Sequence, residues 1–139
     1  MTDKKTKLRV PPQSVDSEKA ILGSIMLRPG AIHEINDIVN FDSFYASKHA
    51  QVYKIMLELS SKGDPIDILS VSHKLEEKGL LEQMGGSSYL SELTNSVPAS
   101  TNIKYYADVV NKKHLLRKIV DAGSDISELG FQEEVENMC

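Results

Sequence analysis

The stretch NIKYYADVVNKKHLLRKIVDAGSDISEL, residues 102–129, decides the fold that we expect for this chain. It predicts one unbroken helix with Ser100 or Thr101 as its N-cap. Along it, apolar residues recur at spacings of four, three, four and three: Leu115, Ile119, Ala122, Ile126 and Leu129. Such a heptad seam is typical of a helix that packs lengthwise against a partner helix.

The sequence on either side of this seam indicates a hairpin. A second apolar stripe is expected to face the rest of the protein, and comprises Tyr106, Val109, Val110, Leu116 and Val120. Gly130-Phe131 predicts a turn, and Glu133 begins what we expect to be a returning helix of about two turns. Residues 100–139 are therefore predicted to form a protruding helical hairpin whose second arm is incomplete.

Residues 14–99 predict a globular helical head. Apolar residues recur at helical spacing near 15–27, 32–39, 47–62, 68–78 and 86–97, and glycine or proline separates these segments. Ile66-Asp67-Ile68 also suits a short strand, but Asp67 is a good N-cap and the spacing that follows favours a helix. Phe41 and Phe44 lie in a connector and are predicted to fill the core. The expected fold is all-α, a compact bundle of about six short helices followed by the hairpin.

The charges are unevenly distributed over the 139 residues, whose net charge is −4. Residues 1–13 predict a disordered basic tail. The end of the chain is acidic, because residues 121–139 contain no Lys or Arg. Their carboxylates are Asp121, Asp125, Glu128, Glu133, Glu134 and Glu136. Duplex-binding proteins usually carry a basic stripe, and none is visible here, so we expect no direct DNA binding. The acidic end favours a basic protein partner, although an ordinary solvated helix face is an equal alternative.

Residue patterns for catalysis, metals and cofactors are absent from the sequence. No G-x-x-x-x-G-K-[ST] loop is present for ATP phosphates, and the four histidines are scattered without metal-ligand spacing. We expect no catalytic, metal or cofactor site in this chain. No apolar run is long enough to span a membrane. Cys139 is the only cysteine, which fits a reducing cytoplasm, and its terminal position favours a cut point in a longer protein over a nucleophile.

Six segments together resemble the amino-terminal domain of DnaB-type replicative helicases. The opening PPQSVDSEKAILGSIM, Pro11 to Met26, resembles the paired prolines, serine cap, acidic first turn and apolar-Leu-Gly ending of that family. The others are Phe44-Tyr45 with His49 and Tyr53, Asp64-Pro65-Ile66-Asp67 with Leu75, Gly79 and Leu81, Gly85-Gly86 with Tyr89-Leu90 and Leu93, Val97 to Ile103 with Tyr106-Ala107 and Val110, and Lys113 with Leu115-Leu116-Arg117. The resemblance covers roughly residues 11–125. Ser17 and the order of the small residues after Pro98 depart from the pattern.

The resemblance implies a non-catalytic assembly and docking domain. In that family the intact protein continues into an ATP- and Mg-dependent hexameric motor, and the amino-terminal domains pair through their hairpins into a collar that binds primase and influences the helicase loader. Candidate interface residues here are the seam, Leu115, Ile119, Ala122, Ile126 and Leu129, with the carboxylates Glu128, Glu133 and Glu134. The alternatives are the helicase-binding domain of a primase, and a small helical enzyme or nucleic-acid-binding domain.

Overall fold

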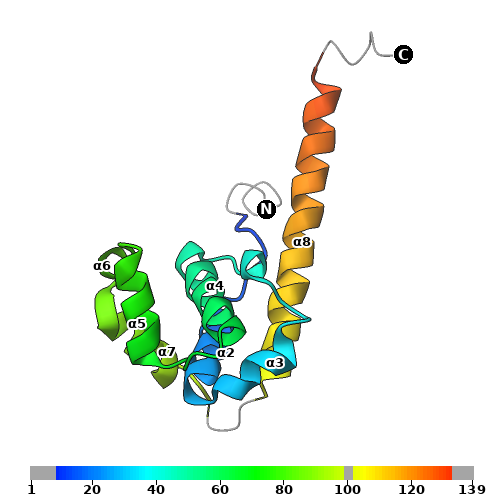
Figure 1. Cartoon of the computed structure of the whole chain (residues 1–139). Coiled ribbons are helices and arrows are strands. Elements are labelled where there is room, and N and C mark those ends of the chain that lie inside the picture. The colour runs from blue at the N-terminus through cyan, green and yellow to red at the C-terminus, as the bar shows by residue number, and fades with distance from the viewer. Residues whose placement is uncertain (1–8, 99–101, 133–139) are drawn as a thin grey trace.

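The computed structural model describes residues 9–98 and 102–132, and these residues are helical apart from turns and connectors. Six short α-helices form a head: α2 (Val15–Leu27), α3 (Ile32–Ile35), α4 (Ser47–Ser61), α5 (Ile68–Glu77), α6 (Leu81–Met84) and α7 (Gly86–Asn95). Two 3-10 turns, η1 (Pro29–Ala31) and η2 (Phe41–Ser43), lie among them, and α8 (Ile103–Gly130) follows. Figure 1 shows α8 rising well beyond the head. The all-α prediction is confirmed.

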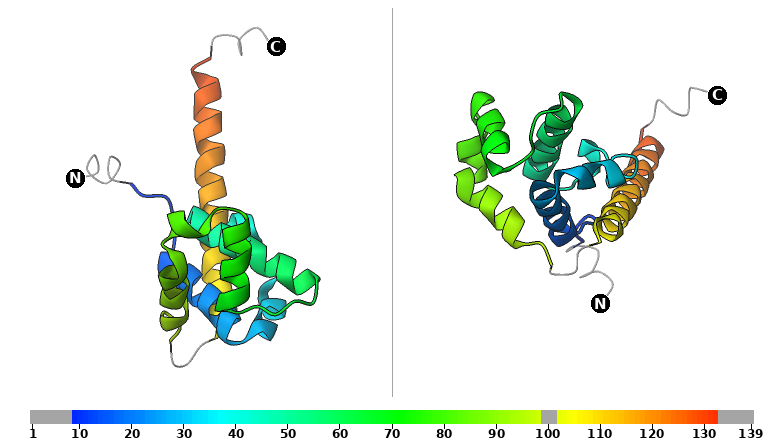
Figure 2. Two further views of the ribbon diagram at one scale, coloured as in Figure 1. Left: turned by 60° about the vertical axis from the view of Figure 1, so that its left-hand side comes forward. Right: turned by 60° about the horizontal axis from the view of Figure 1, so that its bottom comes forward.

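Helix α2 is the centre of the head. Ser14 caps it as the sequence predicts, because its Oγ accepts from the backbone N–H of Ser17 at 3.4 Å. Most of α2 is buried, and α4, α7 and the first half of α8 pack around it. The right-hand view of Figure 2 shows α2, in dark blue, between α7 and α8. The apolar core therefore forms around α2, and α8 is held through its root.

Close packing between α2 and α7 depends on Gly23. A Cβ at this position would lie 2.1 Å from the carbonyl oxygen of Leu93 and 2.6 Å from Cγ2 of Val97. No side chain fits in that space, so the two backbones approach more closely than any other residue would allow. The sequence predicted a helix here but gave no sign that this glycine is a contact point.

The chain at Ile66-Asp67-Ile68 begins a helix, as predicted. The backbone N–H of Ser70 donates to Oδ1 of Asp67 at 2.8 Å, and the N–H of Asp67 donates to Oγ of Ser70 at 3.0 Å. This reciprocal pair is a capping box, which satisfies two donors that the first turn of a helix leaves free. It fixes the start of α5.

The two connector phenylalanines, both predicted to fill the core, differ in burial in the structure. Phe44 is buried and its ring lies 5.0 Å from the ring of Tyr53. Phe41 is 43% exposed, so the prediction that it fills the core is wrong. The 3-10 turn η2 has about three residues per turn, so its three residues face different directions. Ser43 faces inward and is buried, whereas Phe41 lies over the surface of α4, with its ring 5.1 Å from Nζ of Lys54.

A buried carboxylate ties α2 to the start of α4. Glu18 is 1% exposed, and its oxygens accept from the backbone N–H of Tyr45 at 2.6 Å and of Ala46 at 3.2 Å. Its Oε1 also lies 2.8 Å from Nδ1 of His49, which is fully buried. Helix α4 has no side-chain cap of its own, so Glu18 supplies from another helix the acceptor and the negative charge that this N-terminus favours.

Candidate docking surface on the long helix

Helix α8 divides into a packed root and an exposed shaft. Ile103, Ala107 and Val110 are buried against the head, where α8 contacts α2, α3 and η2. From Lys118 onward every described residue is exposed. The shaft therefore stands clear of the head, as Figure 1 and the left view of Figure 2 show.

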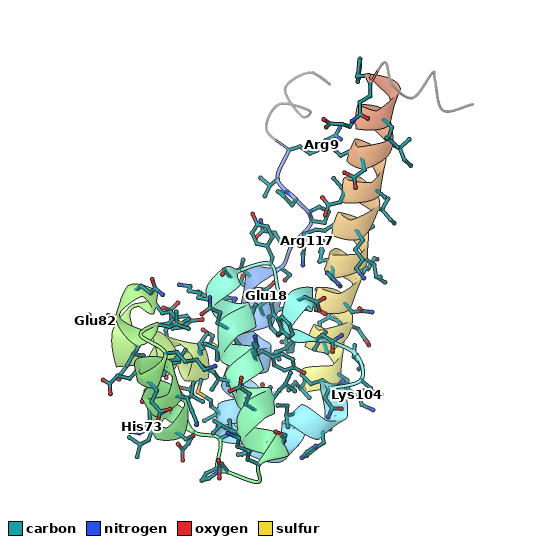
Figure 3. All side chains as sticks on the ribbon, turned by 45° about the horizontal axis from the view of Figure 1, so that its top comes forward. Arg9, Glu18, His73, Glu82, Lys104 and Arg117 are labelled. Carbon is teal, nitrogen blue, oxygen red and sulfur yellow. The ribbon has the colours of Figure 1, made fainter. Side chains whose placement is uncertain are left out.

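Arg117 holds α8 where it leaves the head (Figure 3). Its Nη1 donates to the carbonyl oxygen of Pro12 and its Nη2 to the carbonyl oxygen of Ser43, each at 2.8 Å. Its guanidinium also lies 5.5 Å from the ring of Tyr45. The planar fork of an arginine suits such a double contact. One side chain thus joins the segment before α2, the turn η2 and the root of the shaft, which fixes the direction of α8.

A hollow of about 300 Å³ lies beside this anchor, between the shaft and the chain around η2. His114 lines it, and burial lowers the pKa of this imidazole, with the nearby charge of Lys118 acting in the same direction. Asp42 opposes that shift. The hollow carries both signs of charge, with Arg117 and Lys118 facing Asp42 and Asp121.

The predicted seam is exposed. Its members are half-exposed or more, with Ile119 at 67% and Ile126 at 68%. The full set is Leu115, Ile119, Ala122, Ile126 and Leu129. Exposed apolar side chains that line up along one helix mark a surface that another helix covers. The seam is the longest exposed apolar stripe on the described part of α8.

The second stripe does not face the head along its whole length. Val110 is buried and Tyr106 packs against the core, but Leu116 and Val120 are exposed, at 37% and 52%. The reason is geometric, because the chain around η2 leaves an open hollow beside Val120 and does not cover it. The expectation for these two residues is wrong, and they widen the exposed apolar surface next to the seam.

The acidic candidates lie only partly within the described residues. Glu128 is exposed on the shaft with Asp121 and Asp125. Glu133 and Glu134, and with them the predicted returning arm, lie outside the described residues. Nothing in the sequence marks Arg117 or Glu18 as a contact between segments, since a polar side chain at a helical position looks the same in sequence whether it is solvated or bridges segments.

The sequence contains no phosphate-binding loop. Within residues 9–98 and 102–132, no three His, Cys, Asp or Glu side chains are grouped so that they could hold a metal ion. Over the same residues, no helix combines the length and apolarity that crossing a bilayer requires.

Comparison with known proteins places the chain in a family. Residues 10–112 match the family described as DnaB-like helicase N terminal domain. The chain is 39% identical over 132 residues to the replicative DNA helicase DnaC of Bacillus subtilis. The matched region covers 94% of this chain but only 29% of that helicase. It is 37% identical over 128 residues to the replicative DNA helicase DnaB of Geobacillus stearothermophilus, covering 92% of this chain and 28% of the relative. The chain thus spans less than a third of these relatives.

The fold agrees with solved structures of the same domain. The N-terminal domain of DnaB helicase from Mycobacterium tuberculosis superposes with a TM-score of 0.87 at 36% identity, covering 92% of this chain and 94% of that one. A DnaB-like replicative helicase, described with its interactions with primase, gives a TM-score of 0.72 at 32% identity and covers 86% of this chain and 28% of its own. The chain belongs to the family of DnaB-like helicase N-terminal domains.

Proposed function

We propose that this chain is the non-catalytic assembly and partner-docking domain of a replicative DNA helicase of the bacterial cytoplasm. The observation that carries the proposal is the exposed apolar seam on α8, which projects beyond the head with no other described segment against it. Unwinding, driven by ATP with Mg²⁺, then belongs to the part of such helicases that this chain does not span.

The first partner in this proposal is a second copy of the chain. The part of α8 up to Lys118 is basic, with Lys104, Lys112, Lys113, Arg117 and Lys118 against Asp108. Beyond Lys118 the charged residues of α8 are all carboxylates, Asp121, Asp125 and Glu128. If Leu115 of one copy lies opposite Ile126 of the other, the acidic end of each α8 faces the basic part of its partner. Charge complementarity of this kind fixes register and direction, so the two shafts pair antiparallel.

The test of pairing is the variant Ile126→Asp. Burial of one Ile side chain contributes about 1.5–3 kcal/mol, and a two-fold contact loses that contribution twice. Light scattering over a concentration series should show a wild-type dimer at high concentration and a monomer for the variant. Leu69→Asp is the matched control, because Leu69 is 78% exposed on α5, away from the shaft. A dimer that is indifferent to Ile126→Asp contradicts the proposal.

The second partner is the carboxyl-terminal domain of the cognate primase. A similar replicative helicase has been described with its interactions with primase, and the acidic shaft suits a basic protein surface. Isothermal titration calorimetry against that primase domain should give a dissociation constant in the micromolar range, about −8 kcal/mol. A labelled single-stranded oligonucleotide is the control. Tight binding of the oligonucleotide without binding of primase would favour a nucleic-acid-binding domain. The helicase loader is a further candidate partner on the same assembly.

A further inference from the structure

Two adjoining hollows run over the outer face of α4, on a side of the head that the proposed function does not use. Their volumes are about 330 and 290 Å³, and Ser47 and Gln51 line both. Phe41 of η2 borders one side, and the chain from Lys78 to Met84 borders the other. We call this feature the lysine groove, after Lys48, Lys54 and Lys78, which line it.

The lysine groove has an apolar floor. Ala50, Ile55, Leu80 and Met84 line it, and the exposed ring of Phe41 extends it. An aromatic ring that is 43% exposed beside aliphatic side chains is a typical anchor point for the side chain of a partner. The volumes correspond to a few side chains and not to a whole domain.

The charges at the groove have one dominant sign. Nζ of Lys54 lies 5.1 Å from the Phe41 ring, and Nζ of Lys48 lies 4.5 Å from the Tyr89 ring. No carboxylate among the described residues lies within 4.0 Å of either ammonium group. The charge of Lys78 is partly neutralised, because its Nζ lies 3.5 Å from Oε1 of Glu58. A protein of net charge −4 thus presents, beside an apolar floor, two lysines without a direct ion pair, although Glu92 interacts with Lys48 at longer range.

Gln51 adds a polar group between the two hollows. Its Oε1 is buried and has no hydrogen-bond partner among the residues that the structure describes. If this amide rotates toward the groove, its oxygen breaks no hydrogen bond. The oxygen can then accept an N–H, which is what the backbone of a docked peptide offers.

We propose that the lysine groove docks a short acidic, amphipathic segment of another protein. Carboxylates of the segment contact Lys48 and Lys54, its Leu or Phe side chains lie on the floor beside Phe41, and its backbone donates to Gln51. This assignment rests on the proposed function in one respect: α8 carries the acidic and apolar stripes of this chain, and the proposed function commits these to a second copy and to primase. The segment therefore comes from a different protein.

The chemistry favours a peptide over a nucleic acid. Binding a nucleic acid strand draws most of its affinity from neutralising a row of phosphates, and two free lysines neutralise few. An apolar floor contributes nothing to a phosphate, whereas burial of apolar side chains contributes about 25 cal/mol per Å². An acidic amphipathic segment uses both the charges and the floor.

The experiment measures fluorescence anisotropy of a labelled synthetic peptide in which glutamate alternates with leucine or phenylalanine. Wild-type protein should bind it, and a peptide with lysine in place of each glutamate should not bind. The double variant Lys48→Glu with Lys54→Glu should bind the acidic peptide at least about tenfold more weakly. The matched control, Arg28→Glu with Lys62→Glu, makes the same charge change at exposed basic residues outside both the groove and α8, and should leave binding unchanged.

Two further measurements keep this proposal separate from the assembly proposal. Light scattering of the groove variant should show the wild-type dimer, whereas Ile126→Asp should lose the dimer and keep peptide binding. In an amide NMR spectrum of wild-type protein, added peptide should shift Ala50, Gln51 and Lys54. Equal binding by the groove and control variants, no binding to wild type, or tighter binding of a labelled oligothymidylate that the groove variant abolishes would each overturn the groove assignment. None of these results bears on α8.

Discussion

Nδ1 of His49 lies 2.8 Å from Oε1 of Glu18, and both side chains are buried in the head. A carboxylate only accepts hydrogen bonds, so His49 carries its hydrogen on Nδ1 and donates it. Glu18 also accepts two backbone N–H groups at the start of α4. A single charge from α2 thereby fixes the position of α4, whose outer face forms the lysine groove.

Replacement Glu18→Gln should destabilise the head strongly. The amide keeps one acceptor oxygen for the three donors and sets its NH₂ group against at least one of them, so it leaves a buried donor unpaired. The expected loss in the free energy of unfolding is about 1.5–3 kcal/mol, measured by urea denaturation. Asp16→Asn, the same kind of change at an exposed position in the same helix turn, should have a much smaller effect. Similar losses for the two variants would contradict the capping role of Glu18.

Two glycine-to-alanine changes should alter stability in opposite directions. Gly23→Ala forces a Cβ against the carbonyl oxygen of Leu93, and overpacking of this kind costs about 1–3 kcal/mol. Gly123→Ala lies on the exposed shaft with nothing within 4 Å, where Ala favours the helix by roughly 0.5–1 kcal/mol. Thermal unfolding followed by circular dichroism compares the two variants. A stable Gly23→Ala variant would show that α2 and α7 can move apart.

The sequence is sufficient to predict features that depend on near neighbours. The capping box of Asp67 and Ser70, the cap at Ser14 and the long helix after residue 102 all follow from residues within one or two turns of each other. The exposed heptad seam belongs to the same class, because its spacing is visible along one helix. These are the interactions that local propensity and periodicity describe.

Contacts between distant segments could not be predicted in this way. Arg117 and Pro12 are 105 positions apart, and Glu18 and His49 are 31 apart. No pattern in either local stretch distinguishes a bridging Arg or Glu from a solvated one. The exposure of Phe41 and Val120 has the same origin, since an apolar residue is buried only where another element covers it.

Arg117→Ala should loosen the direction of α8 without unfolding the head. The change removes both donors to the carbonyls of Pro12 and Ser43, and hydrogen bonds from a charged donor are worth about 1.5–3 kcal/mol. With Cys139 replaced by Ser, spin labels at positions 62 and 125 report the distance between head and shaft. We expect a broader distance distribution for Arg117→Ala and no change for Lys118→Ala, whose side chain is exposed. Identical distributions would mean that packing of Val110 and its neighbours alone sets the direction.

The alkaline limit of stability should depend on Tyr53. Burial, and secondarily the charge of Asp37, raises the pKa of this phenol from 10.0 to about 12. Its hydroxyl donates to the carbonyl oxygen of Val39 at 3.1 Å. In the unfolded chain the phenol loses its proton near its ordinary pKa, whereas in the folded protein the phenol stays protonated. The free energy of unfolding therefore falls as the pH rises from about 10 toward 12.

The variant Tyr53→Phe isolates this contribution. At neutral pH it should lose about 0.5–1.5 kcal/mol with the hydrogen bond. Between pH 10 and 12 its free energy of unfolding should fall less steeply than that of the wild type, by up to about 1.4 kcal/mol per pH unit. Urea titrations at several alkaline pH values measure the free energy of unfolding of both proteins. The titration of lysines affects both equally and cancels in the difference between them. Parallel curves would contradict the raised pKa of Tyr53.

Salt should slow the association of this domain with the primase domain, if the acidic shaft attracts a basic partner. Charges exposed to solvent are screened beyond about 10 Å at 0.1 M salt, and steering by such charges acts on the association rate more than on dissociation. The triple variant Glu128→Gln, Glu133→Gln and Glu134→Gln should show a flatter dependence of the stopped-flow association rate on salt. Glu76→Gln with Glu82→Gln removes exposed carboxylates from α5 and α6, which lie on the side of the head away from α8 (Figure 1), and should keep the wild-type slope. A wild-type rate that salt does not change would place the primase contact on the apolar seam alone, with no part for the carboxylates.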